Sequence, residues 1–170
     1  VIKGGSREYV KKLTAPFADR IRLSNPVKKI RRFRDRVEVT PLRGEMEVFD
    51  WVIIAAHSDQ ALRMLTDASD REQEILGAIP YQPNDTILHN DSRVLPRRQL
   101  AWAAWNYYIP KRKKDSVALT YNMNILQSLR ANETYCVTLN QREDIDSESI
   151  LGEYLYHHPV FTEKGVEAQS

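Results

Sequence analysis

An apolar run that leads directly into a helical pattern constrains the fold of this chain more than any other feature. Residues 49–56 read FDWVIIAA, and residues 57–62 continue as HSDQAL. This pattern predicts a buried parallel strand that runs into a helix. In such sheets, ligands collect at the carboxyl ends of the strands, where helix N-termini point at the bound group. Ala55 and Ala56 lie at that end, and their small side chains allow a ligand close to the backbone. Taken alone, these two residues favour a tightly packed strand-to-helix turn, since a feature of the fold is not a function.

Composition narrows the class of protein. A chain of 170 residues fits one domain, or one domain and a piece of another. The 25 Lys and Arg residues nearly balance the 23 Asp and Glu residues, so the net charge does not argue for a polyanionic partner. The single cysteine, Cys136, excludes an internal disulfide framework and agrees with a reducing, cytoplasmic compartment. The longest apolar run is too short to cross a bilayer.

The two ends of the chain predict a piece of a longer protein. Residues 1–5, VIKGG, contain neither an initiator Met nor a signal-peptide pattern. The sequence ends abruptly at residues 167–170, EAQS. We therefore expect further sequence on both sides.

Hydrophobic periodicity and turn residues predict an α+β fold whose first part resembles an α/β protein. A helix is expected over residues 7–15, a short strand over 21–23, a β-meander over 27–49, the buried strand over 51–56 and two helices before Pro80. The second of these helices begins with Ser69-Asp70-Arg71-Glu72, the pattern of a capping box. The connector 80–85 is the predicted internal boundary, which gives domains 1–80 and 81–170.

The second half of the chain predicts a largely antiparallel sheet with helices. Its expected strands are separated by loops short enough for antiparallel neighbours. They cover residues 86–90, 99–109, 116–123, 135–140 and 154–158, with short helices over 124–129 and from 145 to 152.

Two basic runs raise the possibility of a phosphate-binding surface. The first consists of Lys28, Lys29, Arg31, Arg32, Arg34 and Arg36, and the second covers residues 111–114. Such residues could bind nucleic acid, which would make the chain a non-enzymatic module. On a β-ribbon they alternate between faces, which favours a solvated edge that resists strand pairing over a phosphate-binding surface.

Residues 101–108, AWAAWNYY, form the densest aromatic stretch. In a strand, Trp105 and Tyr107 share one face, while Trp102, Asn106 and Tyr108 share the other. One set could line a ligand pocket, and either set could belong to the core. The four histidines have no spacing that completes a metal site. We find no nucleophile elbow, P-loop or dinucleotide fingerprint, and we assign no catalytic residue.

Several segments together resemble the central part of flavin-containing amine oxidases and their bacterial NAD/FAD-binding relatives. They are GGS at residues 4–6 before a helix, IRLSNPVKKI at 21–30, the ribbon, and FDWVIIAA at 49–56. The later YQPN at 81–84, LPRR at 95–98 and AWNY at 104–107 are similar to a bacterial subgroup described as predicted amine oxidases. The resemblance covers nearly the whole chain.

The resemblance implies FAD as the cofactor of the complete protein. Val27 matches the family position whose backbone contacts the adenine of FAD, and Ala55 and Ala56 match the strand end near the cofactor. The second half resembles the substrate domain, in which Trp105 and Tyr107 would line the pocket of a small-molecule substrate. The family's dinucleotide fingerprint and closing C-terminal segment lie outside this chain, so we expect the fragment alone to lack FAD and activity.

The reaction that the resemblance implies is oxidation of a C–N or C–C bond by hydride transfer to flavin. This scheme requires no general base among the residues of the chain. A lost activity, an isomerisation or a desaturation would be equally compatible with the sequence.

Overall fold

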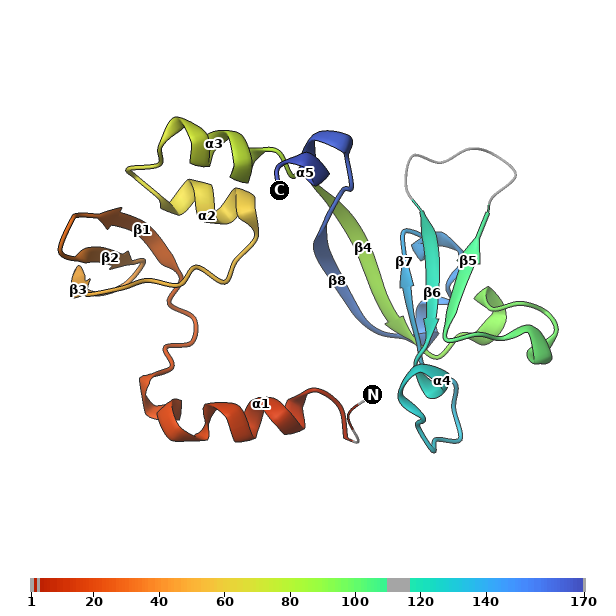
Figure 1. The fold of residues 1–170 in the computed structure, drawn as a ribbon. Helices are drawn as coiled ribbons and strands as arrows, with labels where there is room; N and C mark the ends of the chain where they lie inside the picture. The colour runs from red at the N-terminus through yellow and green to blue at the C-terminus, as the bar shows by residue number, and fades with distance from the viewer. Residues whose placement is uncertain (1, 3, 110–116, 170) are drawn as a thin grey trace. The chain divides into compact units, whose positions relative to one another are not determined.

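The structure is a computed structural model that describes residues 2, 4–109 and 117–169 (Figure 1). These residues form helices and two sheets whose described pairings are antiparallel, which confirms the predicted α+β class at that level. The chain divides into two compact units, and each is described by itself. The meander unit consists of Phe17–Gln82 and Pro159–Ser170, and the sheet unit of Val1–Pro16 and Pro83–His158.

The meander unit contains a three-stranded antiparallel sheet in the order β1-β2-β3. The strands are β1 (Val27–Arg32), β2 (Val37–Pro41) and β3 (Glu47–Phe49), so the predicted meander over residues 27–49 is confirmed. Ile30 of β1 and Val37 of β2 supply its buried apolar side chains. The register shifts between Val27 and Lys29, which marks a bulge at the start of β1.

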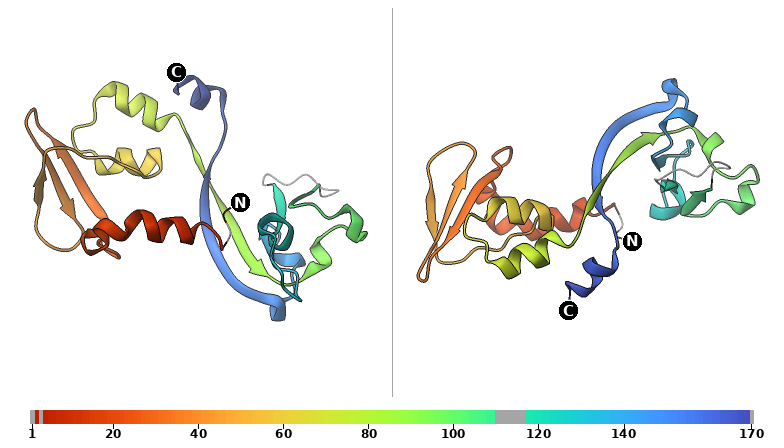
Figure 2. Two further views of the ribbon diagram at one scale, coloured as in Figure 1. Left: turned by 60° about the horizontal axis from the view of Figure 1, so that its bottom comes forward. Right: turned by 90° about the horizontal axis from the view of Figure 1, so that it is seen from above.

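Two helices follow the meander, α2 (Ser58–Met64) and α3 (Asp70–Gly77). They pack on each other, and α2 lies against β1 (Figures 1 and 2). Leu65, directly after α2, forms a parallel bridge with Ile30. The unit also contains α5 (Glu163–Glu167) and most of a 3-10 segment, Ala15–Arg20, that follows the first helix of the chain.

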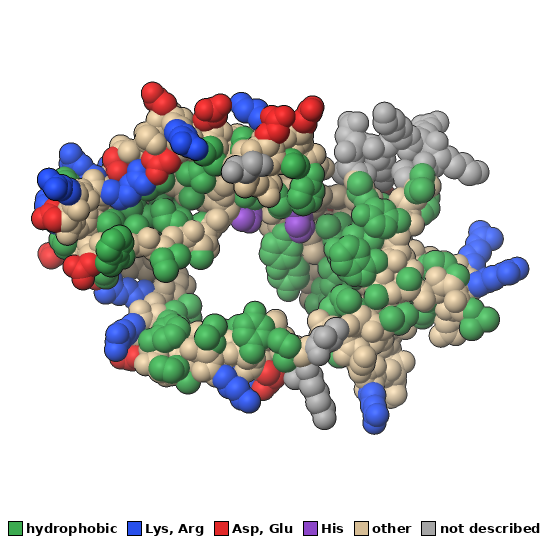
Figure 3. Space-filling view, viewed as in Figure 1, with side chains coloured by type: hydrophobic (Ala, Val, Ile, Leu, Met, Phe, Trp, Pro, Cys, Tyr) green, Lys and Arg blue, Asp and Glu red, His purple; other side chains and the backbone are tan. Residues whose placement is uncertain are grey.

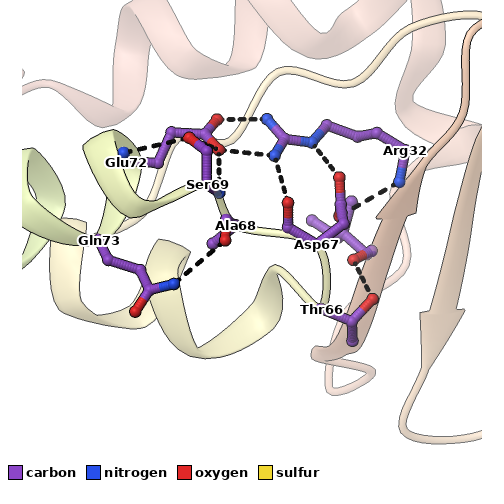
Figure 4. A network of polar contacts seen from close by, with 8 residues as sticks. Arg32, Thr66, Asp67, Ala68, Ser69, Glu72 and Gln73 are labelled. Atoms are coloured by element: carbon purple, nitrogen blue, oxygen red, sulfur yellow. Dashed lines mark hydrogen bonds and ion pairs between the residues drawn. The ribbon is translucent and has the colours of Figure 1, made fainter.

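An ion-pair network fastens the end of β1 to the loop between α2 and α3 (Figure 4). The Arg32 guanidinium donates to both carboxylate oxygens of Glu72 and, through Nε, to Asp67 at 2.7 Å. The predicted capping box is confirmed, because the Ser69 hydroxyl accepts from Glu72 N and the Glu72 carboxylate accepts from Ser69 N. The Arg32 and Ser69 donors together lower the pKa of Glu72 to about 2.

The predicted buried strand over residues 51–56 is wrong for this chain. These residues belong to no strand, and Trp51 and Ile53 are 88% and 93% exposed. A strand needs a hydrogen-bonded neighbour on at least one edge, and no described strand pairs with this segment. The predicted short strand over 21–23 is also absent, and a turn begins at Leu23.

The sheet unit contains a five-stranded sheet in the order β5-β6-β7-β4-β8. Its strands are β4 (Tyr81–His89), β5 (Trp105–Tyr108), β6 (Ala118–Asn122), β7 (Cys136–Leu139) and β8 (Ile150–Pro159). The predicted antiparallel second half is therefore present, with β5 shorter and β8 longer than expected. Its helices are α1 (Arg7–Thr14) and α4 (Met123–Gln127), close to the predicted ranges.

Short 3-10 turns occur in this unit, and two of them, Gln99–Ala101 and Ser147–Ser149, take the place of parts of longer predicted elements. The turns cover Ser92–Val94, Gln99–Ala101, Arg142–Asp144 and Ser147–Ser149. The predicted helix from 145 to 152 is thus wrong, because the turn capped by Asp146 gives way to β8 at Ile150.

One face of the five-stranded sheet is buried and unusually polar. Side chains of His89, Thr120 and Thr138 are almost fully covered, as is the thiol of Cys136. The His89 ring accepts at Nδ1 from Asp91 N and donates from Nε2 to the Thr138 hydroxyl at 2.7 Å, so it is neutral. Burial lowers the pKa of His89 and raises that of Cys136 to about 11. These groups are therefore part of the hydrogen-bonded core of the sheet.

Candidate functional site

The chain enters β1 through a locked turn that fixes the position of Val27. Ser24 adopts a positive φ of 56°, and the Asn25 side chain both donates to Arg43 O and accepts from Arg43 N. Leu42 N donates to Pro26 O at 2.8 Å. These bonds join the entry of β1 to the turn between β2 and β3, so the start of β1 is rigidly placed.

The main-chain N–H and C=O of Val27 point away from β2. Val27 lies opposite Pro41 of β2. The hydrogen bond from Leu42 N to Pro26 O shows that Val27 and Pro41 form a non-hydrogen-bonded pair of the antiparallel ladder. The N–H and C=O of Val27 therefore lie on the open edge of β1. The side chain is 38% exposed, and within the described part of the chain no main-chain hydrogen bond reaches this edge at Val27.

Ala55 and Ala56 lie in the segment that leads into α2, and both are exposed. Tyr81 fixes the start of that helix. Its ring stacks on His57 with centroids 4.4 Å apart, and its hydroxyl accepts from Ser58 N at 3.0 Å. The sequence placed Tyr81 in the motif YQPN at the predicted internal boundary but did not indicate this contact. Tyr81 thus positions the residues that directly follow the two alanines.

The three residues predicted to contact a cofactor all belong to the meander unit. Val27, Ala55 and Ala56 are each exposed, so no helix covers them. Among the described residues, no main-chain hydrogen bond joins Val27 to either alanine. The arrangement offers an open strand edge and two small side chains, both of which a planar group could approach.

Trp105 and Tyr107 lie on the face of the sheet opposite the buried polar core. They alternate with Asn106 along β5, and they are 56% and 65% exposed. The Trp105 ring meets Tyr121 of β6 edge to face, with centroids 5.2 Å apart. Burial and the neighbouring Tyr107 raise the pKa of Tyr121, so this phenol is neutral at physiological pH.

Strand β8 carries further aromatic rings that sequence reasoning did not single out. Tyr154 and Tyr156 stack with centroids 5.9 Å apart, and both are about half exposed. The Tyr154 ring lies over Gly152, where an added Cβ would approach the Tyr154 hydroxyl to 2.7 Å. Hydrophobic side chains gather over this sheet in Figure 3. The period-2 spacing of Gly152, Tyr154 and Tyr156 was the available signal.

Three of the six residues of the first basic run contact other described side chains of the meander unit. Arg32 is held by Asp67 and Glu72, while Arg31 and Arg36 lie over the Phe33 ring at 4.9 and 4.1 Å from its centroid. Arg36 also pairs with Glu38. The second run, residues 111–114, lies outside the described residues. Arg32 and Arg36 of the first run are therefore held by carboxylates of the same unit.

The described residues offer neither a metal site nor a membrane-spanning helix. No group of at least three His, Cys, Asp or Glu side chains in that part of the chain is placed to hold a metal ion. No helix formed by those residues is both long enough and apolar enough to pass through a bilayer.

An α+β chain with an open strand edge and an aromatic sheet face is compatible with many cofactor-dependent enzymes, and comparison with known proteins narrows the class. The model of the family "flavin containing amine oxidoreductase" matches residues 1–148. The chain therefore belongs to this family, which confirms the resemblance seen in the sequence. No curated protein matches the chain.

Among solved structures, the chain is similar to the CLA-producing fatty acid isomerase from P. acnes. The TM-score is 0.56 at 13% sequence identity, and the match covers 89% of this chain and 39% of that protein. The likeness concerns the fold, and the chain spans about two fifths of the length of that structure.

Proposed function

We propose that the chain is the central part of an FAD-dependent oxidoreductase. In this proposal the predicted domain 1–80 contributes part of the FAD site, and the predicted domain 81–170 contributes part of the substrate site. Membership of the flavin containing amine oxidoreductase family is the observation that carries the proposal.

The residues of the meander unit fit an adenine nucleotide. An adenine ring presents both donors and acceptors along its edge, and the outward N–H and C=O of Val27 offer a matching pair. Ala55 and Ala56 are exposed and small, so they allow a cofactor close to the backbone before α2. Bound FAD would supply hydride acceptance, and the residues of this chain would bind and orient.

The sheet unit supplies an aromatic surface for the substrate. Trp105 and Tyr107 project from β5, and the neighbouring Tyr121 keeps its phenol neutral. An uncharged aromatic surface favours binding of the apolar part of a small molecule and excludes water from it. We assign no catalytic residue in this chain, because hydride transfer to flavin requires none here.

Nucleic-acid binding has less support. The side chains of Arg32 and Arg36 are paired with carboxylates of the same unit, so they are not free to neutralise phosphates. The net charge of +2 supplies little additional attraction.

The test is flavin binding by the complete protein, followed by variants of the two cofactor positions. The purified protein should show flavin absorbance. Val27→Pro removes an outward N–H while leaving the β1–β2 bonds in place. Ala56→Leu fills the approach to the backbone. Each should weaken FAD binding about tenfold, which corresponds to about 1.4 kcal/mol.

The control is Ala131→Leu, which adds the same bulk at an exposed residue of the sheet unit. It should leave flavin content unchanged. A complete protein that never binds flavin would refute the proposal. Turnover assays should include isomerisation as well as oxidation, because the similar solved structure is a fatty acid isomerase.

A further inference from the structure

The two alanines of the proposed FAD site lie in a segment that makes no main-chain hydrogen bond with the described part of the chain. None of the residues 51–56 belongs to a strand or a helix, and none of them appears in a main-chain hydrogen bond between described residues. Ala55 and Ala56 are both exposed. The conformation of this segment is therefore set from its two ends, which are β3 and the start of α2.

The start of α2 lacks a local cap. His57 occupies the N-cap position with φ −59° and ψ 146°, and its side chain makes no capping hydrogen bond. The first N–H groups of a helix have no acceptor inside the helix, so they need acceptors from elsewhere. For Ser58 N, the acceptor is the hydroxyl of Tyr81, 23 residues further along the chain.

Tyr81 holds the start of α2 through two different contacts. Its hydroxyl accepts from Ser58 N at 3.0 Å and lies 3.4 Å from Ser58 Oγ. Its ring stacks on the His57 ring, with centroids 4.4 Å apart and 11° between the planes. The hydrogen bond fixes a distance and the stack fixes an orientation. Together they define where the chain continues after Ala56.

Tyr81 is itself held in place. It is half-buried and is the first residue of β4. The residue before it is bonded through its carbonyl, because Val160 N donates to Pro80 O at 2.9 Å. Tyr81, His57 and Ser58 all belong to the meander unit. The start of α2 is thus fastened to a strand end that has its own hydrogen bond.

From this hydrogen bond and this stack, we propose that Tyr81 is a positioning residue of the FAD site. Through His57 and Ser58, it keeps Ala55 and Ala56 in the conformation that admits the cofactor. The inference rests on the proposed function, because it takes the two alanines as cofactor contacts. A segment that is ordered in advance loses less entropy on binding. If only a fraction of the molecules holds the binding conformation, the Kd rises by the inverse of that fraction.

The first test compares FAD titrations of the flavin-free complete protein and its Tyr81→Phe variant. The variant keeps the ring that stacks on His57 and loses the hydroxyl that accepts from Ser58 N. The Kd for FAD should rise about threefold, as expected if the segment holds its binding conformation about one third of the time. Tyr9→Phe is the control, at a tyrosine of α1 that is 49% exposed, and it should leave the Kd unchanged.

The second test removes the donor of the same hydrogen bond. Ser58→Pro eliminates the N–H at the first position of α2, where proline is well tolerated, and the extended conformation of His57 suits a following proline. In the Ser58→Pro background, Tyr81→Phe should change the Kd no further, because the hydroxyl has already lost its partner. An effect of Tyr81→Phe that persists undiminished in that background would overturn the inference.

Two further measurements separate positioning from simple stabilisation. A tyrosine that only stabilised the meander unit would lower its unfolding free energy in urea and leave the Kd of the folded protein unchanged. Nitrogen-15 relaxation of the flavin-free protein reports the order of Ala55, Ala56 and His57 directly. Their order parameters should fall in Tyr81→Phe and stay constant in Tyr9→Phe. Equal order parameters in Tyr81→Phe and wild type would contradict the positioning role.

Failure of this inference is distinguishable from failure of the proposed function. If the wild-type protein binds FAD and Tyr81→Phe binds it equally well, Tyr81 is not a positioning residue, and the FAD site stands. If the complete wild-type protein never binds FAD, both proposals are refuted.

Discussion

Removing the charge of Asp91 should destabilise the sheet unit more than any other single carboxylate change. The side chain of Asp91 is 4% exposed, and its oxygens accept from Arg93 N, from the Arg93 guanidinium and from Asp146 N. These bonds tie the segment after β4 to the segment before β8. They also hold the pKa of Asp91 well below its usual value of 3.8.

The loss of unfolding free energy expected for Asp91→Asn follows from the hydrogen bonds that an amide cannot accept. Oδ1 can still accept from Arg93 N and Nε. The amide nitrogen that replaces Oδ2 faces the donors Arg93 Nη2 and Asp146 N, so two bonds to a charged group are lost. At about 1.5–3 kcal/mol each, the loss in unfolding free energy is at least about 3 kcal/mol.

The assay is urea unfolding in a Trp51→Phe background, in which fluorescence reports Trp102 and Trp105 of the sheet unit. The control is Asp146→Asn, at an exposed carboxylate that lies 3.4 Å from Arg93. It should cost less than about 1 kcal/mol, because exposed ion pairs contribute little. If the two variants lose similar stability, the argument from burial is wrong.

The pH dependence of Asp91→Asn adds a second criterion. The carboxylate is ionised in the folded protein at pH values where the unfolded carboxylate is already protonated. Its stabilisation is therefore complete above about pH 3.8 and is lost as pH falls through the lower pKa of the folded protein. The gap between wild type and Asp91→Asn should narrow in acid and stay constant near neutrality.

Two other experiments test the Arg32–Glu72 ion pair of the meander unit and the core of the sheet unit. Glu72→Gln should lower the stability of the meander unit at neutral pH. Its deficit should vanish as pH falls from about 4.5 to about 2, because Arg32 and Ser69 lower the pKa of Glu72 over that range; urea unfolding at a series of pH values measures this. Cys136 should resist thiol reagents in the native protein and react in urea, because it is fully buried with a pKa raised to about 11.

The parts of the fold that the sequence predicted are those with local causes. The capping box needs only Ser69 and Glu72, which lie three residues apart and satisfy each other's backbone donors. The meander over residues 27–49 is joined by short turns, so each strand finds its partner within the next few residues. The family was predicted because its motifs are spread along the chain.

The segment 51–56 was not predictable in the same way. Its apolar composition is the same whether or not a strand lies beside it, but a strand forms only with a hydrogen-bonded neighbour. In the described residues no such neighbour pairs with it, and Trp51 and Ile53 are exposed. The sequence pattern therefore indicated that the segment favours a strand, but it did not determine whether the segment forms one in this chain.

The edge of the five-stranded sheet shows the opposite limit, because it depends on residues that are distant in sequence. The aromatic stretch alone predicted that Trp105 and Tyr107 share one face and could line a pocket. Only the sheet order, which makes β5 an edge strand, leaves the N–H and C=O of Tyr107 unpaired in the described sheet. Alternation along β5 predicted which side chains share a face, but the use of the strand's edge follows from the pairing of all five strands.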